Sequence, residues 1–172
     1  MPADEEGIVC HPFAPICGLS SRILILGSMP SVHSRQQGYY YGHPQNRFWP
    51  LLAYLFQADQ PQDDAARHQL IVQNNLALWD VLQQCRIKGS ADSSIKAAKA
   101  NPVDQLLGQY PIIAVFANGQ TAARLYKVHL EPLTGLPIKT LPSTSPANAR
   151  FTLEHLADAW QEVKVLASRP YE

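Results

Sequence analysis

The sequence predicts an α/β fold in which a parallel sheet is covered by helices on both faces, because strand-like and helix-like segments alternate along the chain. Residues 22–27 and 111–117 are continuous, largely apolar runs, the pattern of strands that are buried on both faces. Residues 46–56 and 153–167 carry apolar side chains at helical spacing. The length of 172 residues and the 46% hydrophobic content fit one compact domain spanning residues 1–172.

Four strands and five helices are expected, besides a weak helix within one of the loops. The strands are placed at residues 22–27, 76–82, 111–117 and 138–141, and the helices at residues 46–56, 63–74, 103–108, 120–126 and 153–167. Asn46 is the candidate N-cap of the first helix. Residues 28–45 are expected to form a long functional loop, and residues 86–101 a second loop with a weak helix.

Ligands of such folds bind at the carboxyl ends of the strands. In this chain those ends are residues 27–31, Asp80, residues 118–119 and residues 141–150. We therefore expect these four segments to converge on one crevice.

Composition excludes several kinds of site. Fourteen Lys and Arg balance fourteen Asp and Glu, so any nucleic-acid site must be local. Three cysteines without metal-ligand spacing argue against a disulfide scaffold and a four-cysteine metal centre. The six histidines share no short metal-ligand spacing, so no metal is expected. There is no Gly-rich phosphate fingerprint, so no nucleotide cofactor is expected either.

Two further features of the sequence predict a soluble cytoplasmic protein. No apolar run approaches the roughly 20 residues of a membrane span. Asp4, Glu5 and Glu6 stand where a signal peptide is basic.

Two loop segments have side chains suited to binding. Tyr39, Tyr40 and Tyr41 lie in a Gly-flanked loop, where they either stack on a planar ligand or pack the loop onto the sheet. Residues 143–150 offer small hydrogen-bond donors and the cation of Arg150, which suit phosphate oxygens but also an ordinary capping segment. Serines without a nucleophile-elbow pattern make a serine hydrolase a weak candidate.

Four segments together resemble the uracil-DNA glycosylase superfamily, and within it the hypoxanthine-DNA (deoxyinosine) glycosylases. They are GSMPS at residues 27–31, GYYYGHPQNRFW at 38–49, LWDV at 78–81 and LPSTSPANAR at 141–150. The HPQNRFW stretch is also similar to one in the mismatch-specific uracil and thymine glycosylases. The resemblance implies a three-layer α/β/α domain with a four-stranded parallel sheet, and hydrolysis of an N-glycosidic bond in damaged DNA without a cofactor or an obligate protein partner.

The chain departs from the superfamily pattern at two positions. Met29 stands where many members have an Asn or Asp that positions the attacking water, and Leu141 where they have a His or Asn that supports the leaving base. The resemblance to the hypoxanthine branch implies that Asn46 takes over the catalytic role, orienting water through its carbonyl. The competing interpretation is that Asn46 only caps its helix.

The resemblance also assigns the base-binding residues. Backbone N–H groups around Gly27, Ser28 and Met29 are expected to hold a base oxygen. Tyr41 is expected to stack on a flipped base. Asp80 is expected to accept the N1–H of hypoxanthine, although it would equally suit a cap of the following turn.

The DNA-binding residues are expected in the segment after the last strand. Ser143, Thr144, Ser145 and Arg150 are assigned to phosphates, and residues 146–147 to a small wedge. Further cations, namely Arg35, Arg47, Arg86 and Lys88, fall in segments expected to surround the crevice. Two other function classes remain open, a catalytically silent nucleic-acid-binding module of the same fold and an unrelated small-molecule hydrolase.

Overall fold

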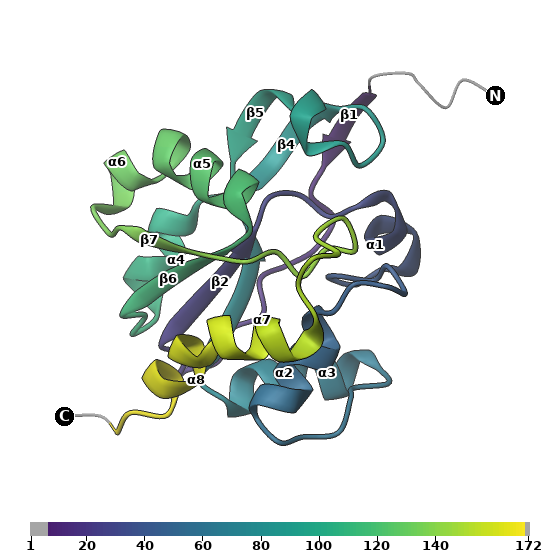
Figure 1. Cartoon of the computed structure of the whole chain (residues 1–172). Coiled ribbons are helices and arrows are strands. Elements are labelled where there is room, and N and C mark those ends of the chain that lie inside the picture. The colour runs from purple at the N-terminus through teal and green to yellow at the C-terminus, as the bar shows by residue number, and fades with distance from the viewer. Residues whose placement is uncertain (1–6, 171–172) are drawn as a thin grey trace.

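The computed structural model describes residues 7–170 and contains the expected parallel sheet (Figure 1). Its four strands are β2 (Ile23–Gly27), β3 (Leu76–Asp80), β6 (Ala114–Asn118) and β7 (Ile138–Leu141). They lie in the order β3-β2-β6-β7, and all neighbours are parallel. The strand at 138–141 has the expected bounds, whereas the third strand starts three residues late and the second ends at Asp80.

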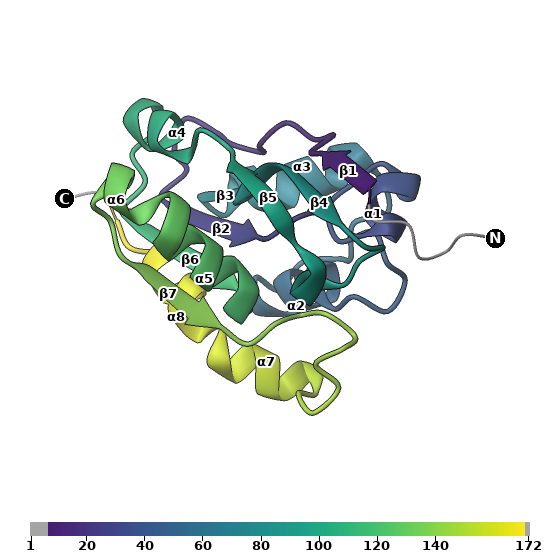
Figure 2. The ribbon, with the colours of Figure 1, turned by 90° about the horizontal axis from the view of Figure 1, so that it is seen from above.

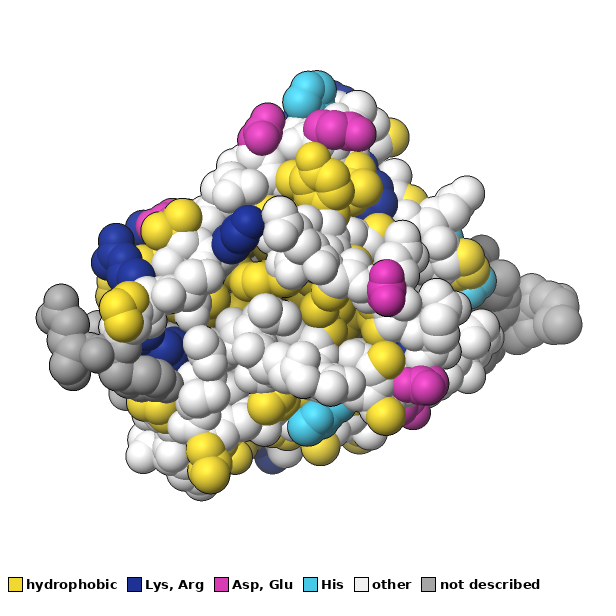
Figure 3. All heavy atoms as spheres, turned by 90° about the horizontal axis from the view of Figure 1, so that it is seen from below, with side chains coloured by type: hydrophobic (Ala, Val, Ile, Leu, Met, Phe, Trp, Pro, Cys, Tyr) yellow, Lys and Arg dark blue, Asp and Glu magenta, His cyan; other side chains and the backbone are white. Residues whose placement is uncertain are grey.

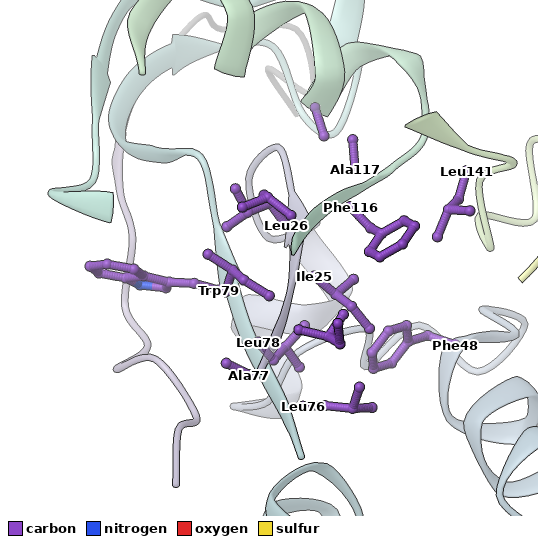
Figure 4. Packing of buried hydrophobic residues seen from close by; sticks show 14 of the residues in the cluster. Ile25, Leu26, Phe48, Leu76, Ala77, Leu78, Trp79, Phe116, Ala117 and Leu141 are labelled. Atoms are coloured by element: carbon purple, nitrogen blue, oxygen red, sulfur yellow. The ribbon is translucent and has the colours of Figure 1, made fainter. Parts of the chain in front are cut away.

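The core lies on both faces of strands β2 and β3. Every residue of β2 and β3 is buried, as their continuous apolar sequences predict. Figure 4 shows Trp79 and Phe48 on opposite sides of the strands, with Ile25 and Leu78 between them. Alternate strand residues therefore point to opposite faces and anchor a helical layer on each.

Helices cover the two faces and complete the three-layer α/β/α arrangement. One layer holds α4 (Val103–Gln109), α5 (Gln120–His129) and α6 (Glu131–Thr134), and α5 packs on β6 and β7. The other holds α2 (Phe48–Leu55), α7 (Leu153–Ala159) and α8 (Gln161–Ala167), while α3 (Asp64–Gln73) packs against β3. Figure 1 shows α5 and α6 above the sheet and α2, α7 and α8 below it. No helix in the described part of the chain is long and apolar enough to span a bilayer.

The prediction for residues 86–101 is wrong. This region belongs to a second, antiparallel sheet of β1 (Gly7–Cys10), β4 (Leu82–Ile87) and β5 (Lys96–Ala100), with a 3₁₀ turn η1 (Asp92–Ser94) between the last two strands (Figure 2). Register shifts between β4 and β5 break the alternation by which a strand is recognised. The other partner, β1, is too distant in the chain for a local pattern to reveal the pairing.

Two smaller corrections have local causes. The long loop at residues 28–45 contains the short helix α1 (Val32–Gln37), which begins with a cap from Ser31 and ends at Gly38 with a φ of +84°. The expected helix at 153–167 is interrupted at Trp160. The indole of this residue donates a hydrogen bond to the carbonyl of Pro142 and so ties the break to the loop after β7.

Candidate active site

The strand ends converge as the sequence predicts. Gly27 is in register with Asp80, and Asn118 with Leu141, so the four parallel strands finish at one edge. A cavity of about 420 Å³ opens there. It is lined by residues from the strand ends and the loops after them, including Gly27, Ser28, Met29, His33, Tyr41, His43, Asn46, Asp80, Asp92, Asn118, Ser143, Thr144 and Ser145.

Gly27 allows two polar side chains to approach the end of β2. A Cβ atom at this position would lie 2.3 Å from Asp80 Oδ1 and 2.8 Å from the hydroxyl of Tyr41. Neither distance is compatible with a side chain at residue 27. The glycine thus brings the carboxylate and the phenol together at the base of the cavity.

The Asp80 side chain is buried and pairs with a residue from the N-terminal segment. His11 Nε2 lies 2.7 Å from Asp80 Oδ2, and the two side chains are 2% and 5% exposed. Among the described residues, Asp80 Oδ1 has no hydrogen-bond partner, and Asp80 lines the cavity. Its carboxylate therefore binds His11 and does not cap the following turn.

The Asn46 side chain is fixed by two neighbours. Its Oδ1 accepts hydrogen bonds from the N–H of Phe48 and from the hydroxyl of Thr144, each at 2.9 Å. Because a backbone N–H only donates, the atom facing it must be the amide oxygen. Helix α2 begins at Phe48, and its N-cap residue is Arg47 and not Asn46 as expected. Asn46 precedes the N-cap and supports the first turn from there.

This arrangement corrects the expected use of the Asn46 carbonyl. The oxygen already accepts two hydrogen bonds, whereas Nδ2 donates none to the described residues. The group that Asn46 has free for the cavity is therefore its amide N–H. Thr144 in turn exchanges two hydrogen bonds with the side chain of Asn118, at 2.9 and 3.0 Å, and so links three segments at the cavity wall.

Tyr41 also lies in the cavity wall, with part of its ring already covered. It adopts a φ of +54°, and its ring stacks on that of Phe48 with a centroid separation of 4.1 Å. Burial, with the nearby Asp80 carboxylate, raises the pKa of Tyr41 above its ordinary value, and Asn118 offsets part of this rise. The phenol is therefore neutral at physiological pH, and only the ring face opposite Phe48 remains for a ligand.

The loop after β7 divides into a buried part and an exposed part. Thr144 is fully buried, so its side chain has no surface to offer a phosphate. Ser143 and Ser145 are partly exposed at the cavity edge, and each hydroxyl accepts a backbone N–H two residues further on. Arg150 is exposed and lies in an adjoining groove that shares Ser143 and Ser145 with the cavity.

One of the cations expected around the crevice has an internal role. The guanidinium of Arg47 donates to the backbone carbonyls of Ser145, Asn148 and Phe151, which holds the loop against α2. On the underside of the molecule, Figure 3 shows Lys and Arg as separate spots with uncharged surface between them. The chain has no net charge, so attraction to DNA depends on local cations such as Arg150.

Several residues at the site were not identified from the sequence. Residues 118–119 are expected at the crevice only as a strand end, yet the side-chain amide of Asn118 bridges to Thr144. His11 lies far from every motif, and its contact with Asp80 spans 69 positions in sequence. His33 and His43 meet edge to face at 4.4 Å beside the cavity. Only His43 had a signal, since it belongs to the HPQNRFW stretch.

Comparisons with known proteins agree with this geometry. The model of the uracil DNA glycosylase superfamily matches residues 14–164. The chain is 34% identical over 157 residues to a hypoxanthine DNA glycosylase of Methanosarcina acetivorans, covering 88% of this chain and 95% of the relative. It is 34% identical over 152 residues to the hypoxanthine DNA glycosylase of Methanosarcina barkeri, with coverages of 87% and 94%.

A solved structure has the same fold. The solution NMR structure of a Methanosarcina acetivorans protein that is proposed to be a uracil DNA glycosylase matches with a TM-score of 0.78 and 31% identity. The match covers 93% of this chain and 99% of that one.

Proposed function

Because the chain belongs to the uracil DNA glycosylase superfamily, we propose that it is a base-excision repair enzyme that hydrolyses the N-glycosidic bond of hypoxanthine in deoxyinosine-containing DNA. Two relatives bearing that activity in their names align over nearly the whole chain. The observation that supports hypoxanthine as the substrate is the free Oδ1 atom of Asp80 at the base of the cavity.

The carboxylate suits the edge of a deaminated adenine. Hypoxanthine has a hydrogen on N1, which Asp80 Oδ1 can accept, whereas adenine has a lone pair at N1 and would be repelled. Gly27 permits the close approach of this oxygen to the end of β2. Asp80 would therefore bind hypoxanthine in preference to adenine. Guanine also carries a hydrogen at N1, so it is included in the test below.

The cavity also suits the chemistry. Cleavage of the bond builds positive charge on the sugar and negative charge on the departing base, and the base must first leave the stack. A cavity of about 420 Å³ accommodates a flipped base. Ser28 and Met29 line the cavity, and their backbone N–H groups would stabilise charge on a base oxygen. No covalent intermediate or cofactor is needed.

Asn46 contributes a hydrogen-bond donor in this proposal. Its amide N–H binds the oxygen of the attacking water or an acceptor on the leaving base, while its carbonyl stays bonded to Phe48 and Thr144. Thr144 acts through Asn46 and Asn118 and not on phosphate. Tyr41 stacks on the base with its remaining face.

Ser143, Ser145 and Arg150 are proposed to bind the phosphates that flank the flipped nucleotide. They line the cavity or the adjoining groove, so their side chains would lie beside a flipped nucleotide. Pro146 and Ala147, which line the cavity from the same loop, are the proposed wedge. The free cysteines Cys10, Cys17 and Cys85 support a reducing compartment, which we take to be the cytoplasm.

The test is a single-turnover assay on duplexes that carry one inosine, uracil, xanthine, guanine or mismatched thymine. We expect release of hypoxanthine to be fastest. Faster release of uracil or mismatched thymine would favour the mismatch-specific enzymes, which share the HPQNRFW stretch. Binding to these duplexes without release of any base would instead identify a silent binding module.

A further inference from the structure

The His11 side chain is the partner of the carboxylate that faces the base, although no sequence motif includes it. His11 directly follows β1, whose pairing with β4 carries the N-terminal segment past the base of the cavity. Its backbone N–H donates to the carbonyl of Gln83 at 2.6 Å, and its ring lies 5.8 Å from that of Tyr40. The imidazole is thus held in place before any substrate arrives.

The hydrogen bonds of the ring identify its tautomer. The backbone N–H of Phe13 donates to His11 Nδ1 at 3.2 Å, so Nδ1 carries a lone pair. The proton of the neutral imidazole is then on Nε2, from which it is donated to Asp80 Oδ2 at 2.7 Å. The pair consequently carries one negative charge, on the carboxylate.

The contact decides which carboxylate oxygen is available. Oδ2 is occupied by His11, and Oδ1 lies near Gly27 and the hydroxyl of Tyr41 at the base of the cavity. A carboxylate without this donor would be free to rotate. Rotation would move the acceptor that distinguishes the N1–H of hypoxanthine from the bare N1 of adenine.

We propose that His11 is a positioning residue for base recognition: its neutral imidazole fixes Asp80 through Oδ2 and leaves Oδ1, still anionic, as the acceptor for the N–H edge of the base. This inference rests on the proposed function, since it specifies how that site reads the base. It assigns a specificity role to a segment outside all four motifs.

The first test compares His11→Leu and His11→Gln. Leucine removes the donor, whereas the glutamine amide supplies both a donor to Asp80 and an acceptor for the Phe13 N–H. We expect His11→Leu to slow single-turnover release of hypoxanthine by about tenfold or more, because a charged hydrogen bond is lost, and His11→Gln to recover most of the rate. His68→Leu, an exposed histidine on α3, is the matched control and should leave the rate unchanged.

Binding to an abasic duplex separates positioning from structural damage. A tetrahydrofuran site has no base, so His11→Leu should bind it within about twofold of the parent protein. In a double-mutant cycle, His11→Leu should add little to Asp80→Asn, because both changes remove the same acceptor. An unchanged rate of hypoxanthine release in His11→Leu, or equal losses for inosine and abasic duplexes, would overturn the proposal.

A measurement on the unmutated protein covers the case in which His11→Leu does not fold. The ¹⁵N shifts of the His11 ring at neutral pH should identify the tautomer with the proton on Nε2. An imidazolium, or a proton on Nδ1, would contradict the inference whatever the activity. If the parent protein releases no hypoxanthine, the proposed function fails, but the ring tautomer still decides whether His11 has the inferred state.

Discussion

The hydroxyl of Thr144 donates to the side-chain oxygen of Asn46 at 2.9 Å, across 98 positions in sequence. This bond joins the loop after β7 to the start of α2, and a second pair of bonds joins Thr144 to Asn118 at the end of β6. Three segments that meet at the cavity therefore share one polar network. The orientation of the Asn46 amide depends on it.

The first prediction concerns Asn46. Asn46→Ala removes both the bonds to the protein and the free amide N–H, and should slow hypoxanthine release by about 10²-fold or more while lowering stability by about 1 kcal/mol. Asn46→Asp keeps an acceptor for Phe48 and Thr144 but loses the N–H donor. The Asn46→Asp protein should therefore keep the melting temperature of the parent protein but release hypoxanthine slowly. An Asn46→Ala protein that is folded and fully active would show that the residue serves only the helix.

The second prediction concerns Gly27. Gly27→Ala places a methyl group 2.3 Å from Asp80 Oδ1, so the carboxylate must move. We expect a loss of about 1–3 kcal/mol in the free energy of unfolding, together with a marked loss of activity. Gly108→Ala is the matched control, because Gly108 is an exposed residue of α4 and a Cβ there meets nothing within 4 Å. It should be neutral or stabilising by up to about 1 kcal/mol. Equal melting temperatures and rates for the two variants would contradict the crowding at Gly27.

The third prediction concerns Arg47. Arg47→Lys keeps the charge but cannot reproduce the planar fork that reaches three carbonyls of the loop at residues 145–151. Stability should fall by about 1–3 kcal/mol, and hypoxanthine release should slow because Thr144 loses its position. Thermal melting and single-turnover rates check this. A variant that changes only the salt dependence of DNA binding would instead mean that Arg47 contacts phosphate.

The fourth prediction concerns Arg150. Arg150→Ala should weaken binding to DNA of any sequence and reduce the slope of log affinity against log salt by about one unit. Lys127→Ala removes the same charge from the exposed part of α5 and serves as the control. If both variants leave the slope unchanged, Arg150 does not bind phosphate.

The parallel sheet was predictable because its strands have local signals. Residues 22–27 and 111–117 are short, largely apolar runs, and the carboxyl ends of the strands must meet when the strands are parallel. This accounts for the correct placement of Asp80 and of residues 27–31 around one cavity. The roles of individual residues within that cavity came from the resemblance and not from periodicity.

What the sequence did not reveal depends on contacts between distant segments. The pairing of β1 with β4 joins residues 7–10 to residues 84–87, and the His11 contact with Asp80 follows from it. The internal hydrogen bonds of Arg47 and Thr144 also join distant segments, so the sequence did not predict them. A side chain in a loop has no periodicity that tells whether it points to DNA or to a neighbouring carbonyl.

The most direct test of the central claim is an internal competition. Equal amounts of two otherwise identical duplexes, one with a single inosine and one with a single uracil, are mixed with the protein, and the free bases are identified by mass spectrometry. We predict that hypoxanthine appears first and that Asp80→Asn slows its release more than the release of uracil. Preferential release of uracil by the parent protein, or no release of hypoxanthine, would contradict the account.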